Sequence, residues 1–276
     1  MILKTSKDAG TLGDLLRDWR STRGKSQLDL ALDADVSQRH LSFIESGRSV
    51  PGREKLLDIA EALGIPLRER NQLLLAAGYA PMFREDAWDD PQMRSITAAA
   101  KRMLKQQEPF PAILMDRYWN VLATNEASPR FFGSFIDMAN RTGPRNVLHL
   151  MFDPTGMRPF IRDWDKVAAS LIGRVRREAV GGVLDPGTRE LLAALLAYPG
   201  APATRTAQTS GELPMIPLSF EKDGEMLSYF SMVSTVGTPT TVAAQELRIE
   251  CMFPADDITE RRHHELAATW PRATVH

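Results

Sequence analysis

The sequence predicts an α+β protein of two domains, in which a small all-helical domain precedes a larger domain built on an antiparallel sheet with helices. Its 276 residues suit about two domains. The first 80 residues carry only helical patterns, whereas strand-like alternation begins near residue 109. Residues 79–95 are mixed in character and contain two prolines, which is typical of a boundary. We therefore predict domains at 1–80 and 109–276, joined by a linker and connecting helix at 81–108.

Composition excludes several classes of protein. Hydrophobic residues make up 43% and charged residues 25%, as in ordinary globular chains, and no stretch approaches the ~20 apolar residues of a membrane span. The start, Met1 to Asp8, lacks an apolar segment of signal-peptide length, so a cytoplasmic location is expected. The single cysteine, Cys251, rules out an internal disulfide or a Cys-rich zinc site, and no metal or cofactor is expected. With a net charge of −1, any DNA binding must depend on where the basic residues stand.

Five short helices are predicted in the first domain, because apolar residues recur there at spacings of three and four. Thr11, followed three residues later by Asp14, has the pattern of a capping box. Ser26 and Ser37 are N-cap candidates for the second and third helices, and Asp35 lies in the turn between them, where Asp tolerates a left-handed backbone. The helices are expected at residues 12–23, 27–33, 38–45, 53–63 and 67–77.

These elements resemble the XRE-type helix-turn-helix of phage repressors over about residues 11–78. The matching runs occur in order: Ser26-Gln-Leu-Asp-Leu-Ala31, Val36-Ser37, Leu41-Ser-Phe-Ile-Glu-Ser-Gly47, Leu56-Leu-Asp-Ile-Ala60 and Leu63-Gly64. The chain departs from the family at Asp35, where glycine is usual, and at Gly52, after the loop proline Pro51. Neither departure removes a position that reads bases.

The resemblance implies that the third helix enters the major groove of double-stranded DNA while the second crosses the backbone. Gln27 matches a position that bonds a phosphate, whereas Gln38, Arg39 and Phe43 match positions that face base edges. The chemistry agrees, since Gln pairs with adenine, Arg pairs with guanine, and an aromatic ring packs on a thymine methyl. The alternatives are a solvated helix face for residues 38–40 and core packing for Phe43. The expected DNA contacts are Gln27, Ser37, Gln38, Arg39, Ser42, Phe43 and Arg48.

The second half alternates strand and helix patterns after a connecting helix at about residues 90–107. Asp223-Gly224 is a strong hairpin turn signal, and Pro186 stands at a helix start. Strands are predicted at 111–115, 119–124, 215–221, 226–234 and 245–253. Helices are predicted at 125–132, 146–152, 158–180 (ended by Gly181-Gly182), 186–198, and after Asp256.

This half resembles the MmyB-like ligand-binding domain, which often follows XRE-type modules, over about residues 109–253. The likeness rests on Pro111 to Asn125, the region of Pro154, and Leu247 to Glu250, with Thr124 standing where relatives often have Trp. The resemblance implies a PAS-like sheet around a small pocket for an apolar or amphipathic ligand such as a fatty acid. Candidate lining residues are Met115, Trp119, Asn125, Phe131, Phe132, Met151, Phe152 and Trp164. The alternatives are that these residues form plain core and that the domain docks a protein without any small molecule.

Catalytic motifs such as G-x-S-x-G, the P-loop and H-E-x-x-H are missing, so we expect no enzyme. His263-His264 is expected on a solvated surface helix, His149 as a satisfied helix histidine, and Cys251 as a buried, inert thiol. The sequence therefore predicts a transcriptional regulator that binds an operator as a homodimer, represses, and responds to a small ligand.

Overall fold

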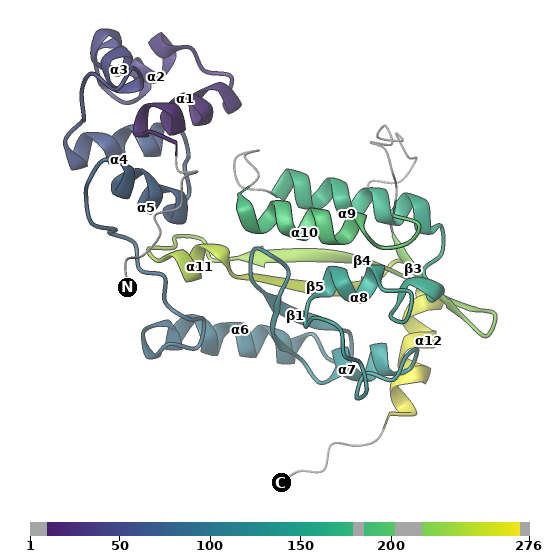
Figure 1. Ribbon diagram of the computed structural model, residues 1–276. Coiled ribbons are helices and arrows are strands. Elements are labelled where there is room, and N and C mark those ends of the chain that lie inside the picture. The colour runs from purple at the N-terminus through teal and green to yellow at the C-terminus, as the bar shows by residue number, and fades with distance from the viewer. Residues whose placement is uncertain (1–9, 179–184, 202–216, 271–276) are drawn as a thin grey trace, which may run out of the picture. The chain divides into compact units, whose positions relative to one another are not determined.

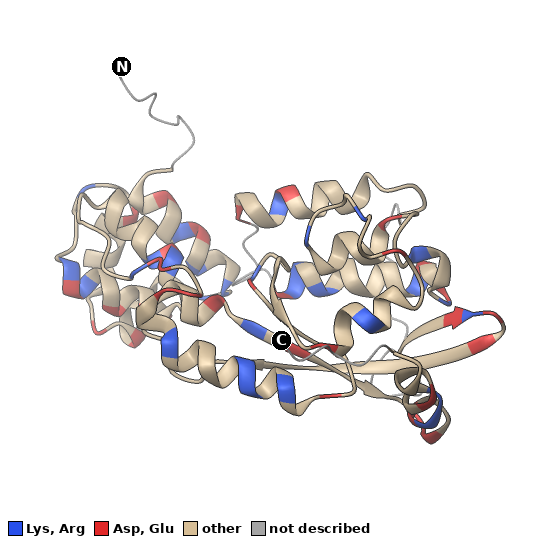
Figure 2. Ribbon diagram, turned by 90° about the horizontal axis from the view of Figure 1, so that it is seen from below, with Lys and Arg blue, Asp and Glu red and all other residues tan. Residues whose placement is uncertain are grey.

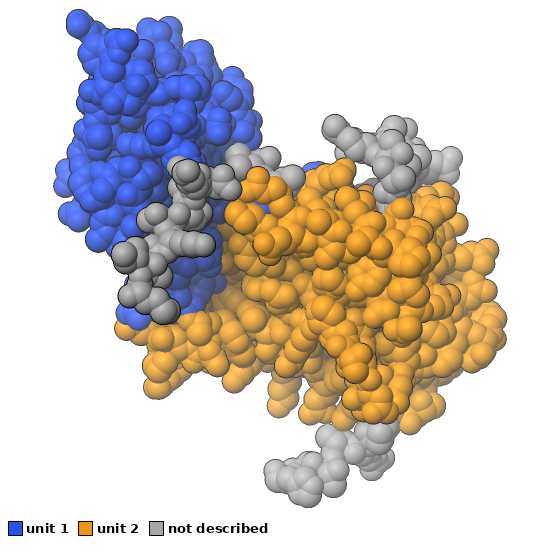
Figure 3. All heavy atoms as spheres, viewed as in Figure 1, with its two compact units in different colours: residues 1–86, 177–185, 239–245 blue, residues 87–176, 186–238, 246–276 orange. Residues whose placement is uncertain are grey.

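The chain forms two compact units, which a computed structural model describes at residues 10–178, 185–201 and 217–270. Unit 1 comprises residues 1–86, 177–185 and 239–245, and unit 2 comprises residues 87–176, 186–238 and 246–276 (Figure 3). Unit 1 therefore includes two short segments from the second half of the sequence.

Unit 1 is the helical domain that the sequence predicts, with α1 (Leu12–Thr22), α2 (Gln27–Asp33), α3 (Gln38–Glu45), α4 (Arg53–Ala62) and α5 (Leu67–Ala76) (Figure 1). Thr11 and Ser26 each accept a hydrogen bond from the backbone N–H three residues later, in complete capping boxes. Ser37 caps α3 by accepting the His40 N–H at 3.1 Å. Asp35 has a φ of 49°, which confirms the expected left-handed turn.

A further helix of unit 1 was not predicted. Here α11 (Val242–Glu246) lies between the last two strands of the sheet, where the sequence predicts a strand from residue 245. Val242 and Ala244 are fully buried, and all but the last residue of α11 belongs to unit 1. The pattern Val-Ala-Ala-Gln-Glu is too short for helical periodicity to be distinguished from a strand.

Unit 2 contains the predicted five-stranded antiparallel sheet, with strand order β2-β1-β5-β4-β3. Asp223 and Gly224, with φ values of 53° and 81°, form the expected tight turn between β3 and β4. The strands are β1 (Ala112–Met115), β2 (Val121–Thr124), β3 (Leu218–Lys222), β4 (Glu225–Thr235) and β5 (Arg248–Pro254). The predicted strand start at Met215 lies outside the described residues.

Helices cover both faces of this sheet, with α9 and α10 on one face and α6 and α12 on the other (Figure 1). The 3-10 helices are η1 (Pro91–Met93) and η2 (Arg158–Phe160). The α-helices are α6 (Arg94–Gln106), α7 (Ala127–Gly133), α8 (Val147–Phe152), α9 (Trp164–Glu178), α10 (Pro186–Leu196) and α12 (Asp257–Ala268). Along the described ranges no helix is both long and apolar enough to cross a membrane.

One long helix was predicted from residue 158, but α9 begins only at Trp164. Asp163 has a φ of 49°, which an α-helix cannot accommodate, and Ile161 pairs as a β-bridge with Phe220. The expected end of that helix, at Val180 and Gly181-Gly182, lies outside the described residues.

A second prediction was wrong at His263, which was expected in solvent and is fully buried. Its Nδ1 lies 2.7 Å from the Tyr229 hydroxyl and its Nε2 lies 2.9 Å from the Pro109 carbonyl oxygen. Because a carbonyl oxygen only accepts, Nε2 carries the proton and Nδ1 accepts from Tyr229. Helix α12 packs on β4, so His263 faces inward while His264 stays exposed.

Candidate nucleic-acid interface

Three helices of unit 1 meet at Glu45, the last residue of α3, which is 3% exposed. Arg20 of α1 donates to both carboxylate oxygens, at 2.6 and 2.9 Å, and Gln27 of α2 donates to one of them at 2.8 Å. Arg17 donates to the Glu45 carbonyl at 2.5 Å. Burial opposes ionisation of Glu45, but the bonds from Arg20 and Gln27 outweigh it and hold its pKa below the usual range. The charge pair and its hydrogen bonds fix α3 against its two neighbours.

The approach of α1 to the end of α3 depends on Gly13. A Cβ at this position would lie 2.5 Å from the Glu45 carbonyl oxygen, which is backbone and has no room to move. Glycine is therefore the residue that permits this packing.

The exposed side of α3 carries an aromatic ring flanked by two cations. The guanidinium carbons of Arg39 and Arg48 lie 5.4 and 5.9 Å from the centre of the half-buried Phe43 ring. Gln38 is exposed and Ser42 is half-buried. We name Gln38, Arg39, Ser42, Phe43 and Arg48 the reading face, after the role that the sequence predicts for them. Its side chains include hydrogen-bond donors of the kind that pair with guanine and adenine, beside an apolar ring.

Two of the residues that the sequence predicts as DNA contacts form hydrogen bonds with other residues of unit 1. The Gln27 amide donates to Glu45, and the Ser37 hydroxyl accepts the N–H of His40. Both residues stand at the N-terminal ends of their helices, α2 and α3. The structure therefore brings Arg39 and Arg48 against Phe43, and bonds Gln27 and Ser37 to other residues of unit 1.

Charges of both signs are interspersed over the helices of unit 1 (Figure 2). The reading face is thus distinguished by the placement of a few cations, and bulk charge adds little. In unit 2, α6 shows only basic bands, since its sequence contains Lys and Arg but no acidic residue.

The predicted ligand-lining residues are packed in the interior of unit 2. Seven of the eight are buried and Trp164 is half-buried. Phe152 and Trp164 meet edge to face at 4.9 Å, whereas Phe131 and Phe132 form a separate contact at 5.3 Å. These two contacts join different members of the predicted set.

Trp119 and Asn125 hold the turns around β1 and β2. Trp119 has a φ of 67°, a strained value for a bulky residue, and the Arg174 guanidinium lies 4.3 Å from its ring centre. The Asn125 side chain accepts the backbone N–H of Ala112 and donates to the Phe110 carbonyl. These contacts give both landmark residues a structural part in the sheet.

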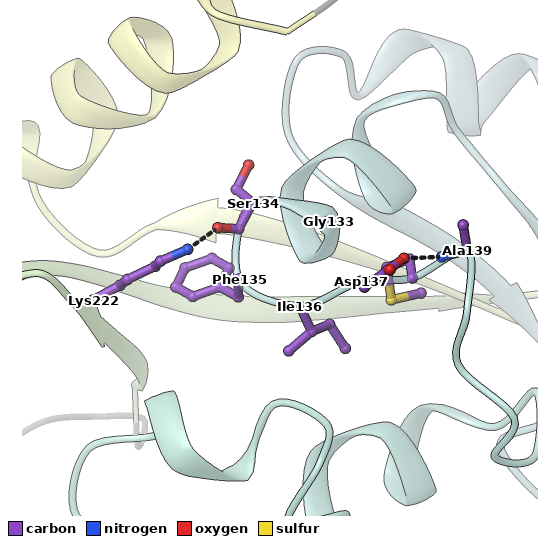
Figure 4. A pocket seen from close by; sticks show the side chains of 8 residues that line it. Gly133, Ser134, Phe135, Ile136, Asp137, Ala139 and Lys222 are labelled. Atoms are coloured by element: carbon purple, nitrogen blue, oxygen red, sulfur yellow. Dashed lines mark hydrogen bonds between the residues drawn. The ribbon is translucent and has the colours of Figure 1, made fainter.

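A surface hollow of about 530 Å³, which we name the Lys222 hollow, lies at the end of α7 (Figure 4). Lys222 donates to the Ser134 carbonyl at 2.6 Å, beside the ring of Phe135. Its lining comprises Gly133, Ser134, Phe135, Ile136, Asp137, Met138, Ala139 and Lys222. None of these residues is among the eight lining residues that the sequence predicts.

His149 and Cys251 lie within unit 2 much as expected. The Nδ1 of His149 lies 2.9 Å from the Tyr198 hydroxyl, so this helix histidine is satisfied. Cys251 is half-buried rather than fully buried, and burial raises the pKa of its thiol. A raised thiol pKa makes the reactive thiolate scarcer.

Comparison with known families matches both units. A helix-turn-helix family covers residues 16–70, and the MmyB-like transcription regulator ligand binding domain covers residues 96–266. A search of curated proteins finds none that matches the chain. Since the second match spans more than half of the sequence, the chain belongs to the MmyB-like transcription regulators, and is a DNA-binding transcription regulator with a ligand-binding domain.

Proposed function

We propose that this regulator is a repressor that binds a two-fold operator as a homodimer and responds to a small apolar or amphipathic ligand. The observation that carries the DNA-reading part is the reading face of α3, where Arg39 and Arg48 flank Phe43. Contact with the Phe43 ring limits the freedom of both arginine side chains before DNA arrives.

The homodimer follows from how little DNA one α3 spans. A recognition helix of eight residues contacts a few base pairs, so specific affinity requires a second copy on a matching half-site. In a two-fold assembly the two α3 helices would lie one turn of DNA apart, about 34 Å.

For the ligand, the Lys222 hollow supports a molecule with an apolar body and an anionic end. Phe135, Ile136 and Met138 supply apolar surface, and Lys222 supplies a cation at the rim. A ligand can regulate only if it favours one of two states of the protein, so binding must differ between the DNA-bound and free forms.

Selection of bound sequences from a random pool of double-stranded DNA tests the first part. Recovery of a motif with two-fold symmetry is expected, and its half-site spacing gives the dimer geometry. Recovery of a single asymmetric half-site would contradict the homodimer, and recovery of nothing above background would contradict DNA reading by the free chain.

A second candidate is a regulator whose C-terminal domain docks a protein and binds no small molecule. The close packing of the eight predicted lining residues favours this reading. Mass spectrometry of molecules extracted from purified full-length protein separates the two. A stoichiometric amphipathic molecule, lost from the variant Lys222→Glu, supports the ligand, and its absence supports the docking module.

A further inference from the structure

Helix α6 of unit 2 carries surface charge of one sign. Its 13 residues include four cations and no acidic residue. At 3.6 residues per turn, the four cations fall within about 100° of the helix circumference. All four are exposed, and the basic bands of α6 are visible in Figure 2. We name them the α6 basic stripe: Arg94, Lys101, Arg102 and Lys105.

The stripe lacks the acidic partners that cations on other helices have. In α7, for example, Arg130 pairs with Glu126 four residues earlier. No ion pair joins the stripe to a carboxylate in the described part of the chain. Asp90 and Glu108, the nearest acidic residues in sequence on either side of α6, each accept backbone N–H groups. The four cations are therefore open to an external anion.

This arrangement costs stability while no anion is bound. Lys105 follows Lys101 by four residues and Arg102 by three, and like charges at these spacings repel one another on a helix. Arg94 is the first residue of α6, where the helix dipole disfavours a cation. A helix face that only meets water usually intersperses both signs. An anionic partner would offset the repulsion.

The shape of the stripe suits a linear polyanion. The helix rises about 17 Å from Arg94 to Lys105, and one strand of DNA presents about five phosphates over that length. A two-fold contact with a second copy would set like charges against each other, since it joins identical surfaces. A lipid surface needs an exposed apolar face, whereas Ala100 and Leu104 of α6 are buried.

Duplex DNA is the polyanion that a DNA-binding regulator meets. We propose that the α6 basic stripe binds the phosphate backbone of duplex DNA, as a DNA-contacting surface on the ligand-binding domain. Because phosphates are alike at every base pair, this contact adds affinity and no base preference. The inference goes beyond the proposed function, since it concerns a surface of unit 2 and needs no base contact by α3.

The salt dependence of DNA binding by the full chain tests this inference. Each cation that contacts a phosphate releases a counterion, so removing one contact lowers the slope of log affinity against log salt by about 0.9. The test variant replaces the stripe with glutamine, which favours helix. We expect its slope to be smaller than that of the wild type by about 2 to 4 between about 50 and 200 mM salt. The substitutions are Arg94→Gln, Lys101→Gln, Arg102→Gln and Lys105→Gln.

Two probes are used, a random-sequence duplex and a duplex recovered by DNA selection. On both, the variant is expected to bind at least about tenfold more weakly at about 100 mM salt, with its base preference unchanged. The smaller variant Arg102→Gln with Lys105→Gln is expected to show about half of the slope change. It keeps the test decisive if the fourfold variant does not fold.

A matched control makes the same change in net charge elsewhere in unit 2 and is expected to keep the wild-type slope. It replaces four exposed cations with glutamine: Arg162, Lys166, Arg189 and Arg261. A control slope as low as that of the test variant would overturn a local contact at α6, because bulk charge alone would then explain the effect.

Equal slopes in the wild type and the test variant would overturn the inference alone, and would favour an acidic protein as the partner of the stripe. A changed base preference in the test variant would overturn the assignment to phosphates. A wild type that binds neither duplex would overturn the inference together with the proposed function.

Discussion

Phe43 is the residue on which the character of the reading face depends. A large apolar ring on the exposed side of a helix is costly in water unless something covers it. Here the guanidinium groups of Arg39 and Arg48 lie over the Phe43 ring and cover part of it. The same arrangement limits the freedom of two long side chains, which reduces the entropy lost when they bind.

Arg39→Ala is expected to relax the preference at one base pair of each half-site, at a cost of about 1–3 kcal/mol, because a bidentate contact to guanine would be lost. Binding to every single-base variant of the operator, measured with wild type and mutant, checks this. Arg189→Ala, an exposed cation on α10, is the control and should leave all preferences unchanged. Equal weakening on every sequence would show that Arg39 contacts a phosphate.

A second expectation at this scale concerns acid stability and His263. Burial lowers the pKa of His263 from its ordinary value of 6.5. Below pH 6.5 the unfolded chain therefore binds a proton that the folded chain does not, so the free energy of unfolding falls as pH falls.

For this histidine we expect the free energy of unfolding to be lower at pH 5.5 than at pH 7.5. Urea unfolding at the two pH values measures it. His263→Gln cannot titrate, so its pH dependence should be smaller than that of the wild type. His149, whose pKa burial also lowers, contributes equally to both proteins and cancels in the comparison. An identical pH dependence in both proteins would refute the assignment.

At the scale of elements, the packing of α1 on α3 gives a sharp expectation. Gly13→Ala would press a methyl group into the Glu45 backbone and should destabilise the fold by about 3 kcal/mol. Gly133→Ala, in helix α7 with open space around it, should be neutral or stabilise by up to about 1 kcal/mol. Thermal unfolding of both variants checks the pair, and a stable Gly13→Ala protein would contradict the close approach.

The helices of unit 1 were predictable because their signals are local. Caps at Thr11, Ser26 and Ser37, and a left-handed Asp35, act within a few residues of themselves. The Asp223-Gly224 turn was predictable for the same reason.

The missed features depend on contacts between distant segments. The buried His263 bonds Tyr229 and the Pro109 carbonyl, and α11 is a helix of only five residues. Of the candidate site, residue types on α3 were predictable from spacing, whereas the Glu45 hydrogen bonds to Gln27 and Arg20 were not.

At the scale of the whole molecule, the chain joins a DNA-binding helix-turn-helix domain to a ligand-binding domain. A ligand regulates DNA binding only if each binding event changes the free energy of the other.

The central claim is that α3 reads bases in the major groove. Methylation interference on a recovered operator tests this most directly, because dimethyl sulfate marks guanine N7 in the major groove and adenine N3 in the minor groove. The account predicts that guanine N7 methylation blocks binding at symmetric positions in both half-sites, and that Arg39→Ala abolishes this interference. Interference confined to adenine N3, or unchanged in Arg39→Ala, would contradict it.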